Sequence, residues 1–505
     1  MQFAFYPHHE HNCPNVGHCP HLGGASLGTL VLAAGANGQH IAMLQGQLLS
    51  ERRSVATLVA ENEQLRQQLE QCRLELKAER QRRFCKDRPQ EKQPDPPPAV
   101  APEGGKKPGA PQGHPGWFRP QPTVWDKVIE VSPPSQCPHC GGGVRPQPHR
   151  PPYDHIQEDV VDGRLQVVLY RHAAGRCQQC RNWVKQAGVG EILGSKIGPH
   201  ARAMAAFLHN EIGVSASKVP QAIAGLSQLR FTSSALFGFE TKLARNAKPL
   251  VRDIAGKIRS TNDALYADET YWSLDGKRAY FWIHATRRYV HFHFTPTRAG
   301  KVSRRILGDD FTGILVTDCY AGYDAQEAAA KQKCLAHLTR TARDWQKVVP
   351  QNSLAWTFFE EIKTWVTRGC RLHRMRSTMD DIGISTETVW LRSEQQRLEN
   401  TAALDQDKAR TLQKRMRRYS SEWLTFLDHP EVSPTNNHAE QILRPLVILR
   451  KITFGHRSQA GARRTARLMT VMETAKRHGH GSLDIFYRLS VDPPESVLRH
   501  LYSGP

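Results

Sequence analysis

Acidic residues and long apolar runs are the features of which the sequence has least. Its 505 residues hold 48 Asp and Glu against 69 Lys and Arg, which leaves a formal net charge of +21. A chain this basic is expected to bind a polyanion, and nucleic acid is the usual one. The apolar stretch at 23–36 is too short to span a bilayer, and the first residues lack the segments of a signal peptide. We therefore expect a soluble, cytoplasmic protein with no membrane partner.

Cysteine is also sparse, and its placement argues against a disulfide framework. Most of the eleven cysteines are isolated, which suits a reducing compartment. Four form two C-x-x-C pairs around a strand-like pair of segments: Cys137, Cys140, Cys177 and Cys180. Four sulfur ligands satisfy tetrahedral Zn²⁺, so we predict a zinc ribbon with a structural ion within 123–190. Redox-active or disulfide-bonded pairs are the alternatives, and two copies of the motif disfavour them.

A chain of this length is too long for one core, and the segments before the zinc motif differ in composition. Residues 1–40 begin with a His- and Cys-rich tract, which we interpret as a disordered start rather than a metal site. Residues 41–84 follow a heptad pattern with Asn62 at a core position, which predicts a leucine-zipper-like coiled coil between two chains. A single amphipathic helix is the alternative. Residues 85–122 are rich in Pro, Gly and Lys and predict an extended linker.

Residues 191–260 show the apolar spacing of three short helices. The third helix is expected to begin near Thr232 or Ser233, either of which can cap it. Three such helices are typical of a helix-turn-helix DNA-binding region, whose last helix enters the major groove. A helical spacer explains the pattern equally well.

The pattern then changes to strands, and acidic residues stand on two of them. ALYADETYW, RAYFWIHAT and RYVHFHFT predict a three-stranded meander with a turn at Asp275-Gly276, and a short helix then leads to the strand GILVTD. A strand over 332–337 (QKCLAH) leads into another helix. This order is that of a ribonuclease H-like fold, in which the fourth strand lies parallel to the first. Asp268, in the last part of the first strand, and Asp318, at the end of the fourth, would lie side by side.

Two carboxylates that meet at one sheet edge repel each other unless a cation lies between them. Mg²⁺ is the natural partner because it binds carboxylate, water and phosphate oxygens, and two such ions serve phosphoryl displacement. A third carboxylate should come from a later helix. Glu440 is our candidate, early in an amphipathic helix that Thr435 or Asn436 can cap. A first-turn Glu can also simply complement the helix dipole.

We therefore predict an α/β multidomain protein with a ribonuclease H-like core, preceded by the coiled coil, the zinc ribbon and the helical DNA-binding region. Its later parts are the first part of the core at 261–345, a basic helical insertion at 346–433, and a final core helix with a tail at 434–505. The clustered arginines of the insertion would contact DNA phosphates, or form a solvated face. His337, expected on the strand after Asp318, could steer a phosphate or a water, or be structural. Glu269 should face away from Asp268 and play a structural part.

Four motifs in this order, ADET, VTDCYAGY, CLAHLTR and NNHAEQILRPLVILRKITFG, resemble the insertion sequence 66 family of bacterial DDE transposases. The zipper-like helix, the Pro-rich linker, the two C-x-x-C pairs and the C-terminal METAKRHG resemble that family as well, so the likeness covers roughly residues 41–490. Two positions depart from it. Cys319 stands where the family usually has Gly, and Gln441 stands where Arg commonly follows the Glu.

The resemblance implies a transposase that cuts the ends of a mobile element with Mg²⁺ or Mn²⁺ and transfers the freed 3′-OH to target DNA. The implied catalytic and metal-binding triad is Asp268, Asp318 and Glu440. The residues expected to bind the DNA backbone nearby are Arg444, Arg450 and Lys451. The implied partners are double-stranded DNA in the bacterial nucleoid, a second copy of the chain, and small accessory proteins. A catalytically inactive DNA-binding regulator and another ribonuclease H-like nuclease are the alternatives.

Overall fold

The computed structural model describes residues 38–84, 119–351 and 353–504. The chain divides into two compact units, Met1–Ala101 and Pro102–Pro505, and each is described by itself. The predicted start at 1–40 and linker at 85–122 fall almost wholly outside the described residues. Among the helices that are described, none combines the length and the apolar character needed to cross a membrane.

The described part of the first unit is one helix, α2, which spans Gly38–Phe84. The heptad pattern therefore correctly predicts a long helix. Its described seam side chains lie open to solvent, with Val55, Leu58, Leu65 and Leu69 each more than half exposed. The association of two chains through this seam stays a prediction.

The second unit begins with two small sheets that carry the cysteine pairs. The first sheet has the order β1-β4-β3 and the second has the order β2-β5-β6. Their strands are β1 (Lys127–Val131), β2 (Val144–Pro146), β3 (Tyr153–Val161), β4 (Arg164–His172), β5 (Gly175–Cys177) and β6 (Trp183–Val184). The predicted strand pair is the β3–β4 hairpin. Its turn is Asp162-Gly163, where both residues have positive φ, as a tight two-residue hairpin turn requires.

A helical segment follows, and it has one more helix than expected. It contains α3 (Pro199–Asn210), α4 (Val219–Ser227), α5 (Ser233–Asn246) and α6 (Lys248–Arg259). The predicted cap of the third helix is confirmed, since Thr232 Oγ1 accepts the N–H of Ala235. The additional helix is α6, which has Pro249 in its first turn, where proline is tolerated.

The centre of the second unit is a five-stranded sheet with the order β11-β10-β7-β8-β9. Its strands are β7 (Ala264–Leu274), β8 (Lys277–Ala285), β9 (Val290–Thr295), β10 (Ile314–Thr317) and β11 (Ala330–Lys333). The predicted meander is confirmed, including its turn at Asp275-Gly276. The fourth strand, β10, pairs in parallel with the first, β7, as expected. β11 extends the sheet in parallel to β10.

Two local predictions around this sheet are wrong. Asp268 is the fifth of eleven residues in β7, because the strand continues past it as a hairpin with β8. A 3₁₀ turn, η2 (Ala321–Tyr323), lies between β10 and β11. The next strand ends at Lys333 rather than at His337, because Cys334 is the N-cap of α8 (Leu335–Gln346).

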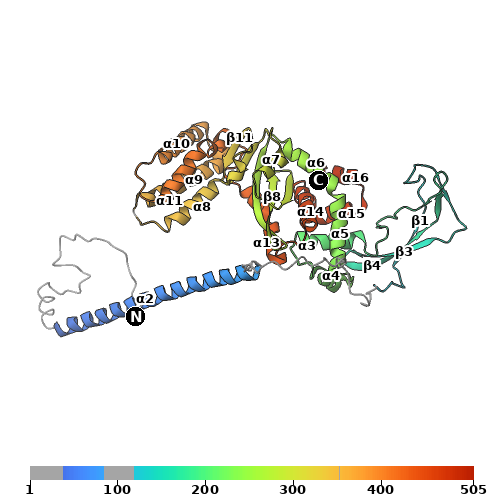
Figure 1. The fold of residues 1–505 in the computed structure, drawn as a ribbon, viewed down its shortest axis with the longest axis horizontal. Helices are drawn as coiled ribbons and strands as arrows, with labels where there is room; N and C mark the ends of the chain where they lie inside the picture. Colours follow the sequence, from blue (N-terminus) through green and yellow to red (C-terminus); the bar gives the residue numbers. More distant parts are fainter. Residues whose placement is uncertain (1–37, 85–118, 352, 505) are drawn as a thin grey trace, which may run out of the picture. The chain divides into compact units, whose positions relative to one another are not determined.

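The predicted insertion is helical and has its own hydrophobic core. It contains α9 (Leu354–Met375), α10 (Asp381–Glu399), α11 (Asp407–Arg418) and α12 (Thr425–Asp428). Buried side chains such as Phe358, Trp365, Leu391 and Trp423 fill its interior, together with residues of α8. Figure 1 shows α9, α10 and α11 grouped beside α8 and β11.

The chain then returns to the central sheet. It does so through α13 (Asn437–Thr453), α14 (Gln459–Arg477), α15 (Ser482–Val491) and α16 (Pro494–Tyr502). The helix α13 packs on β7 and β8, and α14 packs on β9 and on α5. As predicted, Ile442, Leu443 and Leu446 form the buried face of α13. One core therefore joins the sheet to helices from before and after it in sequence.

Candidate active site

Asp268 and Asp318 come together through the parallel pairing of β7 with β10. The register matches Ile314 with Ala264 and Val316 with Tyr266. Extending it by two residues places Asp318, just after β10, opposite Asp268. Facing residues on neighbouring strands point to the same side of the sheet, with their strands about 4.8 Å apart. The two acids thus stand on one face, where the sequence predicts them.

The charge around Asp268 is not balanced by the protein alone. Burial first, and then the carboxylates of Glu269, Asp318 and Glu440, raise the pKa of Asp268 to about 8. A buried carboxyl group surrounded by other acids stays protonated near neutral pH unless a cation joins it. The donor set is all oxygen, which suits Mg²⁺ or Mn²⁺. The residues present therefore fit a divalent cation.

Glu440 lies early in α13, as predicted, close enough to Asp268 to raise its pKa. The carboxylate of Glu440 nevertheless lies beside nitrogen atoms of two basic residues of α8. Glu440 Oε1 lies 3.6 Å from His337 Nε2, and Oε2 lies 3.9 Å from Arg340 Nη2. Among the described residues, Cys334, His337 and Glu440 form a group that could hold a metal ion, with all three ligand atoms within 4.8 Å of one another. The two aspartates are not part of that group. His337 itself is in the first turn of α8 and not on a strand.

Glu269 has partners of its own within the protein. Arg298 donates to Glu269 Oε1 from Nε at 2.9 Å and from Nη2 at 2.6 Å. The hydroxyl of Tyr323 donates to Oε2 at 2.6 Å. The side chain of Glu269 is only 2% exposed. These contacts agree with a structural part for Glu269, as expected from the alternation along the strand.

Asn436 is a residue of this site that sequence reasoning valued only as a helix cap. It stands at the N-cap position of α13, but its side chain makes no capping bond. Instead, Asn436 Nδ2 donates to the carbonyl of Ala267 at 2.8 Å, and its backbone N–H points at Cys334 Sγ at 3.1 Å. Asn436 therefore ties the start of α13 to β7 and to α8. The Asn pair before Glu440 is the only sequence signal, and it reads equally as a cap.

Lys333 is a second residue that the sequence did not indicate. It is fully buried beside the end of β10, where its ammonium group donates to Thr317 Oγ1 at 3.1 Å. The carboxylates of Glu422 and Asp324 lie 3.5 Å and 3.9 Å from Lys333 Nζ. A buried ammonium needs such partners. Lys333 therefore links the strand that leads to Asp318 with the helical insertion.

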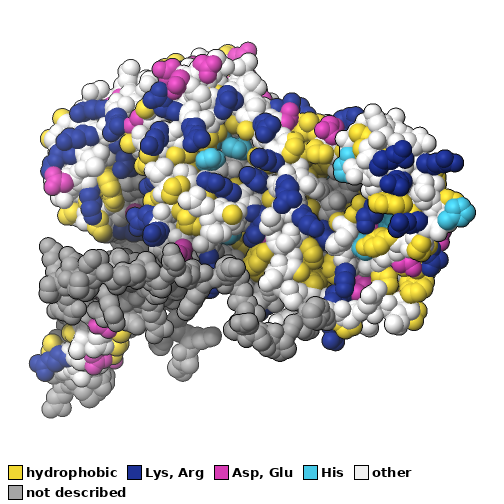
Figure 2. Space-filling model, turned by 45° about the vertical axis from the view of Figure 1, so that its right-hand side comes forward, with side chains coloured by type: hydrophobic (Ala, Val, Ile, Leu, Met, Phe, Trp, Pro, Cys, Tyr) yellow, Lys and Arg dark blue, Asp and Glu magenta, His cyan; other side chains and the backbone are white. Residues whose placement is uncertain are grey.

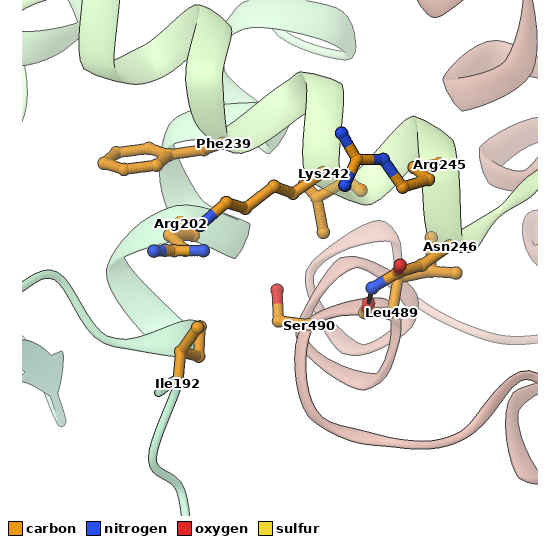
Figure 3. A pocket seen from close by; sticks show the side chains of 9 residues that line it. Ile192, Arg202, Phe239, Lys242, Arg245, Asn246, Leu489 and Ser490 are labelled. Carbon is orange, nitrogen blue, oxygen red and sulfur yellow. Dashed lines mark hydrogen bonds between the residues drawn. The ribbon is translucent and has the colours of Figure 1, made fainter. Parts of the chain in front are cut away.

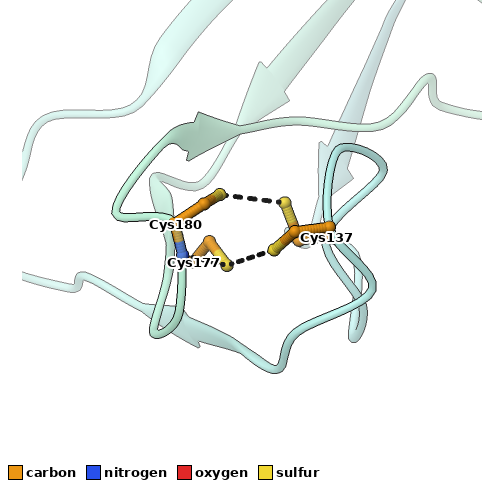
Figure 4. Close-up of side chains that lie close together, drawn as sticks. Cys137, Cys177 and Cys180 are labelled. Atoms are coloured by element: carbon orange, nitrogen blue, oxygen red, sulfur yellow. Dashed lines mark hydrogen bonds between the residues drawn. The ribbon is translucent and has the colours of Figure 1, made fainter.

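The four cysteines of the two C-x-x-C pairs lie together, as predicted. The thiols of Cys137 and Cys180 are 3.6 Å apart, those of Cys140 and Cys177 are 3.5 Å apart, and all four sulfurs lie within 4.8 Å of one another. Figure 4 shows the two pairs facing each other from adjacent loops. The backbone N–H of Cys180 lowers the pKa of the Cys177 thiol to about 6. This donor set fits Zn²⁺ with all four positions filled by protein.

Basic side chains line two cavities of the second unit. A cavity of about 630 Å³ near the start of α13 is lined by Arg340, Arg343, Arg374 and His373 among others. Figure 2 shows Lys and Arg side chains spread over one face of the molecule, with fewer Asp and Glu among them.

The second cavity, of about 170 Å³, is lined by Arg202, Lys242 and Arg245. Figure 3 shows the ammonium end of Lys242 directed toward the guanidinium of Arg202. Burial, followed by the charges of Arg202 and Arg245, lowers the pKa of Lys242. Crowded cations of this kind suit a phosphate group.

The three basic residues predicted near the active site differ in their surroundings. Arg444 and Lys451 are exposed on α13. Arg450 instead donates to Thr270 Oγ1 at 2.9 Å and to the carbonyl of Tyr271 at 2.5 Å. Arg450 therefore holds α13 against β7, and DNA binding by all three stays a prediction.

Comparison with known proteins agrees with the sequence motifs. The family model described as Transposase IS66 family matches residues 194–464, which is more than half of the chain. A search of curated proteins found no match. The matched region contains the central sheet, both aspartates, the helical insertion and Glu440. The chain belongs to the IS66 family of DDE transposases.

Proposed function

We propose that this chain is an active transposase that cuts DNA at the ends of its element and joins the freed 3′-OH to target DNA. The observation that carries the proposal is the placement of Asp318 opposite Asp268 across β7 and β10, with the helix of Glu440 packed on the same strand. The strand order and the parallel β7–β10 pair support a ribonuclease H-like core. Membership of a phosphoryl-transfer family supports the type of reaction.

Asp268, Asp318 and Glu440 would hold the divalent ions, which supply charge stabilisation and an activated oxygen nucleophile when bound. Asp268 must lose its proton before it binds a cation, because its pKa is raised to about 8. Glu440 must also turn from His337 toward the aspartates. Asn436 keeps the start of α13 against β7, so that this turn requires only a side-chain rotation.

DNA would be bound by basic residues outside the triad. The cavity lined by Arg340, Arg343 and Arg374 opens beside Pro434, Thr435 and Asn437, at the start of the helix that carries Glu440. A DNA phosphate bound in this cavity would lie next to the DNA strand that is cut. The cavity at Lys242 would hold a second backbone phosphate, in the helical region proposed for end recognition. Phosphate contacts of this kind position the duplex without reading its sequence.

The remaining parts are proposed to serve assembly. The zinc ribbon at 123–190 would present its sheets to DNA or to a second chain, held in shape by one Zn²⁺. The helix α2 would pair two chains, and element-encoded accessory proteins would join the complex. The nucleoid is the compartment where all of these partners meet.

The test is cleavage of linear DNA that contains the element's ends, in the presence of Mg²⁺ or Mn²⁺. Asp268→Asn should abolish cleavage and strand transfer while DNA binding is retained. Glu269→Gln is the matched control, because it changes the adjacent carboxyl to an amide on the other side of β7. We expect Glu269→Gln to keep most of the cleavage. If the wild-type protein binds ends but shows no cleavage under either metal, the chain is a DNA-binding regulator and the proposal fails.

A further inference from the structure

We propose that Cys334, His337 and Glu440 form a zinc site, separate from the Cys₄ cluster, that holds Glu440 away from the two aspartates. Its consequence for activity depends on the function proposed above, whereas zinc binding itself does not. In this proposal the acid of the triad has two alternative positions. In one position Glu440 binds the divalent ions of catalysis together with the two aspartates. In the other position it binds a single Zn²⁺, which inhibits the enzyme.

The spacing of the donor atoms fits one tetrahedral ion. All three ligand atoms lie within 4.8 Å of one another. His337 Nε2 and Glu440 Oε1 are 3.6 Å apart, which is too long for a hydrogen bond. With metal bonds of about 2.0 Å to nitrogen and oxygen and about 2.3 Å to sulfur, ligand atoms on one tetrahedral Zn²⁺ lie roughly 3.3–3.6 Å apart. The site therefore needs only small shifts to close around the ion.

The three side chains differ in their exposure to solvent. Cys334 is fully buried, whereas the side chains of His337 and Glu440 are 31% and 27% exposed. Within the described part of the chain, Glu440 Oε1 is a buried atom that lacks a hydrogen-bond partner. Arg340 approaches the other oxygen of Glu440, so Oε1 stays available. An unpaired buried carboxylate oxygen beside a thiol and an imidazole nitrogen is accounted for if a cation completes the group.

The donor types select the metal. A thiolate and an imidazole favour Zn²⁺ over Mg²⁺, which binds oxygen ligands. Cys334 Sγ lies 3.1 Å from the backbone nitrogen of Asn436, which begins the helix that carries Glu440. The same three residues thus offer zinc a site that magnesium cannot use.

The carboxylate of Glu440 cannot bind both kinds of ion at once. Zinc therefore competes with the catalytic divalent ions for Glu440. Zinc bound to Cys334 and His337 would remove the third carboxylate from the aspartates. Cleavage in Mg²⁺ should then fall as zinc is added and return when a chelator removes the weaker zinc ion. Cys334→Ser should cleave in Mg²⁺ and resist this inhibition, because serine preserves the N-cap position of α8 but is a poor zinc ligand.

The decisive measurement is the zinc content of the full-length protein after equilibrium dialysis against micromolar Zn²⁺. Cys334→Ser should bind one zinc fewer per chain than wild type. Cys370→Ser is the matched control, because Cys370 is a partly buried thiol outside the proposed site that lines the cavity near the start of α13. It should bind as much zinc as wild type. The difference between the two variants cancels zinc held by the Cys₄ cluster or by other histidines.

Two further variants keep the outcome clear. His337→Asn removes a partly exposed ligand without disturbing the buried thiol, and it should also bind one zinc fewer. Asp268→Asn should bind as much zinc as wild type, since the proposed ion does not contact the aspartates. Replacement of zinc by Co²⁺ should give a thiolate-to-cobalt absorption band that Cys334→Ser reduces and Cys370→Ser does not.

Equal zinc content in Cys334→Ser, His337→Asn and Cys370→Ser overturns the inference, whatever the activity. If those zinc contents differ as expected but no variant or wild-type protein cleaves DNA, the zinc site stands and the proposed function fails. If cleavage depends on Mg²⁺ but zinc inhibits Cys334→Ser as strongly as wild type, the inhibitory role is wrong. The two proposals can therefore fail separately.

Discussion

At the scale of single residues, Asp268 combines a functional position with an unfavourable charge. Its carboxyl group is desolvated and lies near three other acids, and its pKa is raised to about 8. In the unfolded chain the same group titrates near 3.8. A folded state that holds a proton more tightly than the unfolded state loses stability as the pH rises between the two values. Asp268 should therefore destabilise the metal-free protein most at and above pH 8.

This loss of stability at high pH leads to a prediction for the Asp268→Asn variant in EDTA. The variant should melt higher than wild type at pH 8, by roughly 5 °C or more, and the difference should shrink toward pH 4. Mg²⁺ should raise the melting temperature of wild type and have little effect on the variant. The measurement is thermal unfolding followed by circular dichroism across that pH range. A variant that is less stable than wild type at pH 8 would show that Asp268 is satisfied without a cation.

The residues of the site differ in how far the sequence could predict them. Asp268 and Asp318 followed from strand order, because the parallel neighbour of β7 fixes which residues face each other. The side-chain direction of Glu440 did not follow, since a helical position leaves several rotamers open. Cys334 and Asn436 were missed because their contacts cross the boundaries between β7, α8 and α13, which no local pattern encodes.

At the scale of elements, the loop between α13 and α14 is held to β7 by a neutral histidine. Trp272 donates from Nε1 to His456 Nδ1 at 2.9 Å, and the other ring nitrogen of His456 lies 3.0 Å from Thr465 Oγ1. Burial first, and then the charge of Arg464, lowers the pKa of His456 to about 4. Protonation of Nδ1 would remove the acceptor for Trp272. The neutral form is thus part of the packing between the two elements.

We predict that His456 contributes to unfolding in mild acid. Its stabilising effect is complete above the unfolded pKa of about 6.5 and is lost as the pH falls toward about 4, at a total of about 3 kcal/mol. His456→Gln keeps an acceptor for Trp272 but cannot gain a charge, so its stability should fall less over this range. Urea unfolding at pH 7, 5.5 and 4.5 measures the difference. Parallel pH profiles for the two proteins would contradict the assignment.

The second prediction at this scale concerns Lys242 on α5. If its cavity holds a DNA phosphate, Lys242→Ala should weaken DNA binding at low salt and reduce the slope of log affinity against log salt by about 0.9. Lys347→Ala is the control, since Lys347 is exposed and already paired with Asp344 at 3.3 Å. Fluorescence anisotropy with duplex DNA at several salt concentrations gives both slopes. Equal slopes for both variants would show that this cavity does not bind a DNA phosphate.

Element types were easier to predict than element ends. The strand pair between the cysteine motifs, the meander and its turn at Asp275-Gly276 followed from alternation and turn chemistry. The helix α6, the 3₁₀ turn η2 and the boundary between β11 and α8 did not. Tertiary contacts decide these ends, as when Leu335 N–H donates to the carbonyl of Pro434, 99 residues away along the chain. Local spacing cannot show such a partner.

At the scale of the whole molecule, charge and length point to an assembly on DNA. The excess of 69 basic over 48 acidic residues is a property of the complete chain. Single arginines are less informative, because many are already paired: Arg368 binds Glu387 and Arg410 binds Asp407, both in the helical insertion. Net charge thus predicted the class of partner, whereas the arginines that bind it must be sought among those that line cavities, such as Arg340 and Arg343.

The last prediction concerns the number of chains in that assembly. Leu58 and Leu65 occupy seam positions of α2 and are 58% and 62% exposed in the single chain. Burying such side chains stabilises association by about 1.5–3 kcal/mol each. Leu58→Glu with Leu65→Glu should therefore convert a dimer into a monomer, as measured by sedimentation equilibrium. Glu63→Lys is the control, because Glu63 is also exposed on α2 but lies off the seam.

The zinc content and the melting temperature of the second unit should be the same in all these proteins, since the seam lies in the first unit. Cleavage of a DNA with two ends should fall in the monomeric variant more than binding of a single end, because pairing two ends requires two chains. A wild-type chain that sediments as a monomer would instead assign the apolar seam to another partner, and equal sedimentation of wild type and double variant would place dimerisation outside α2.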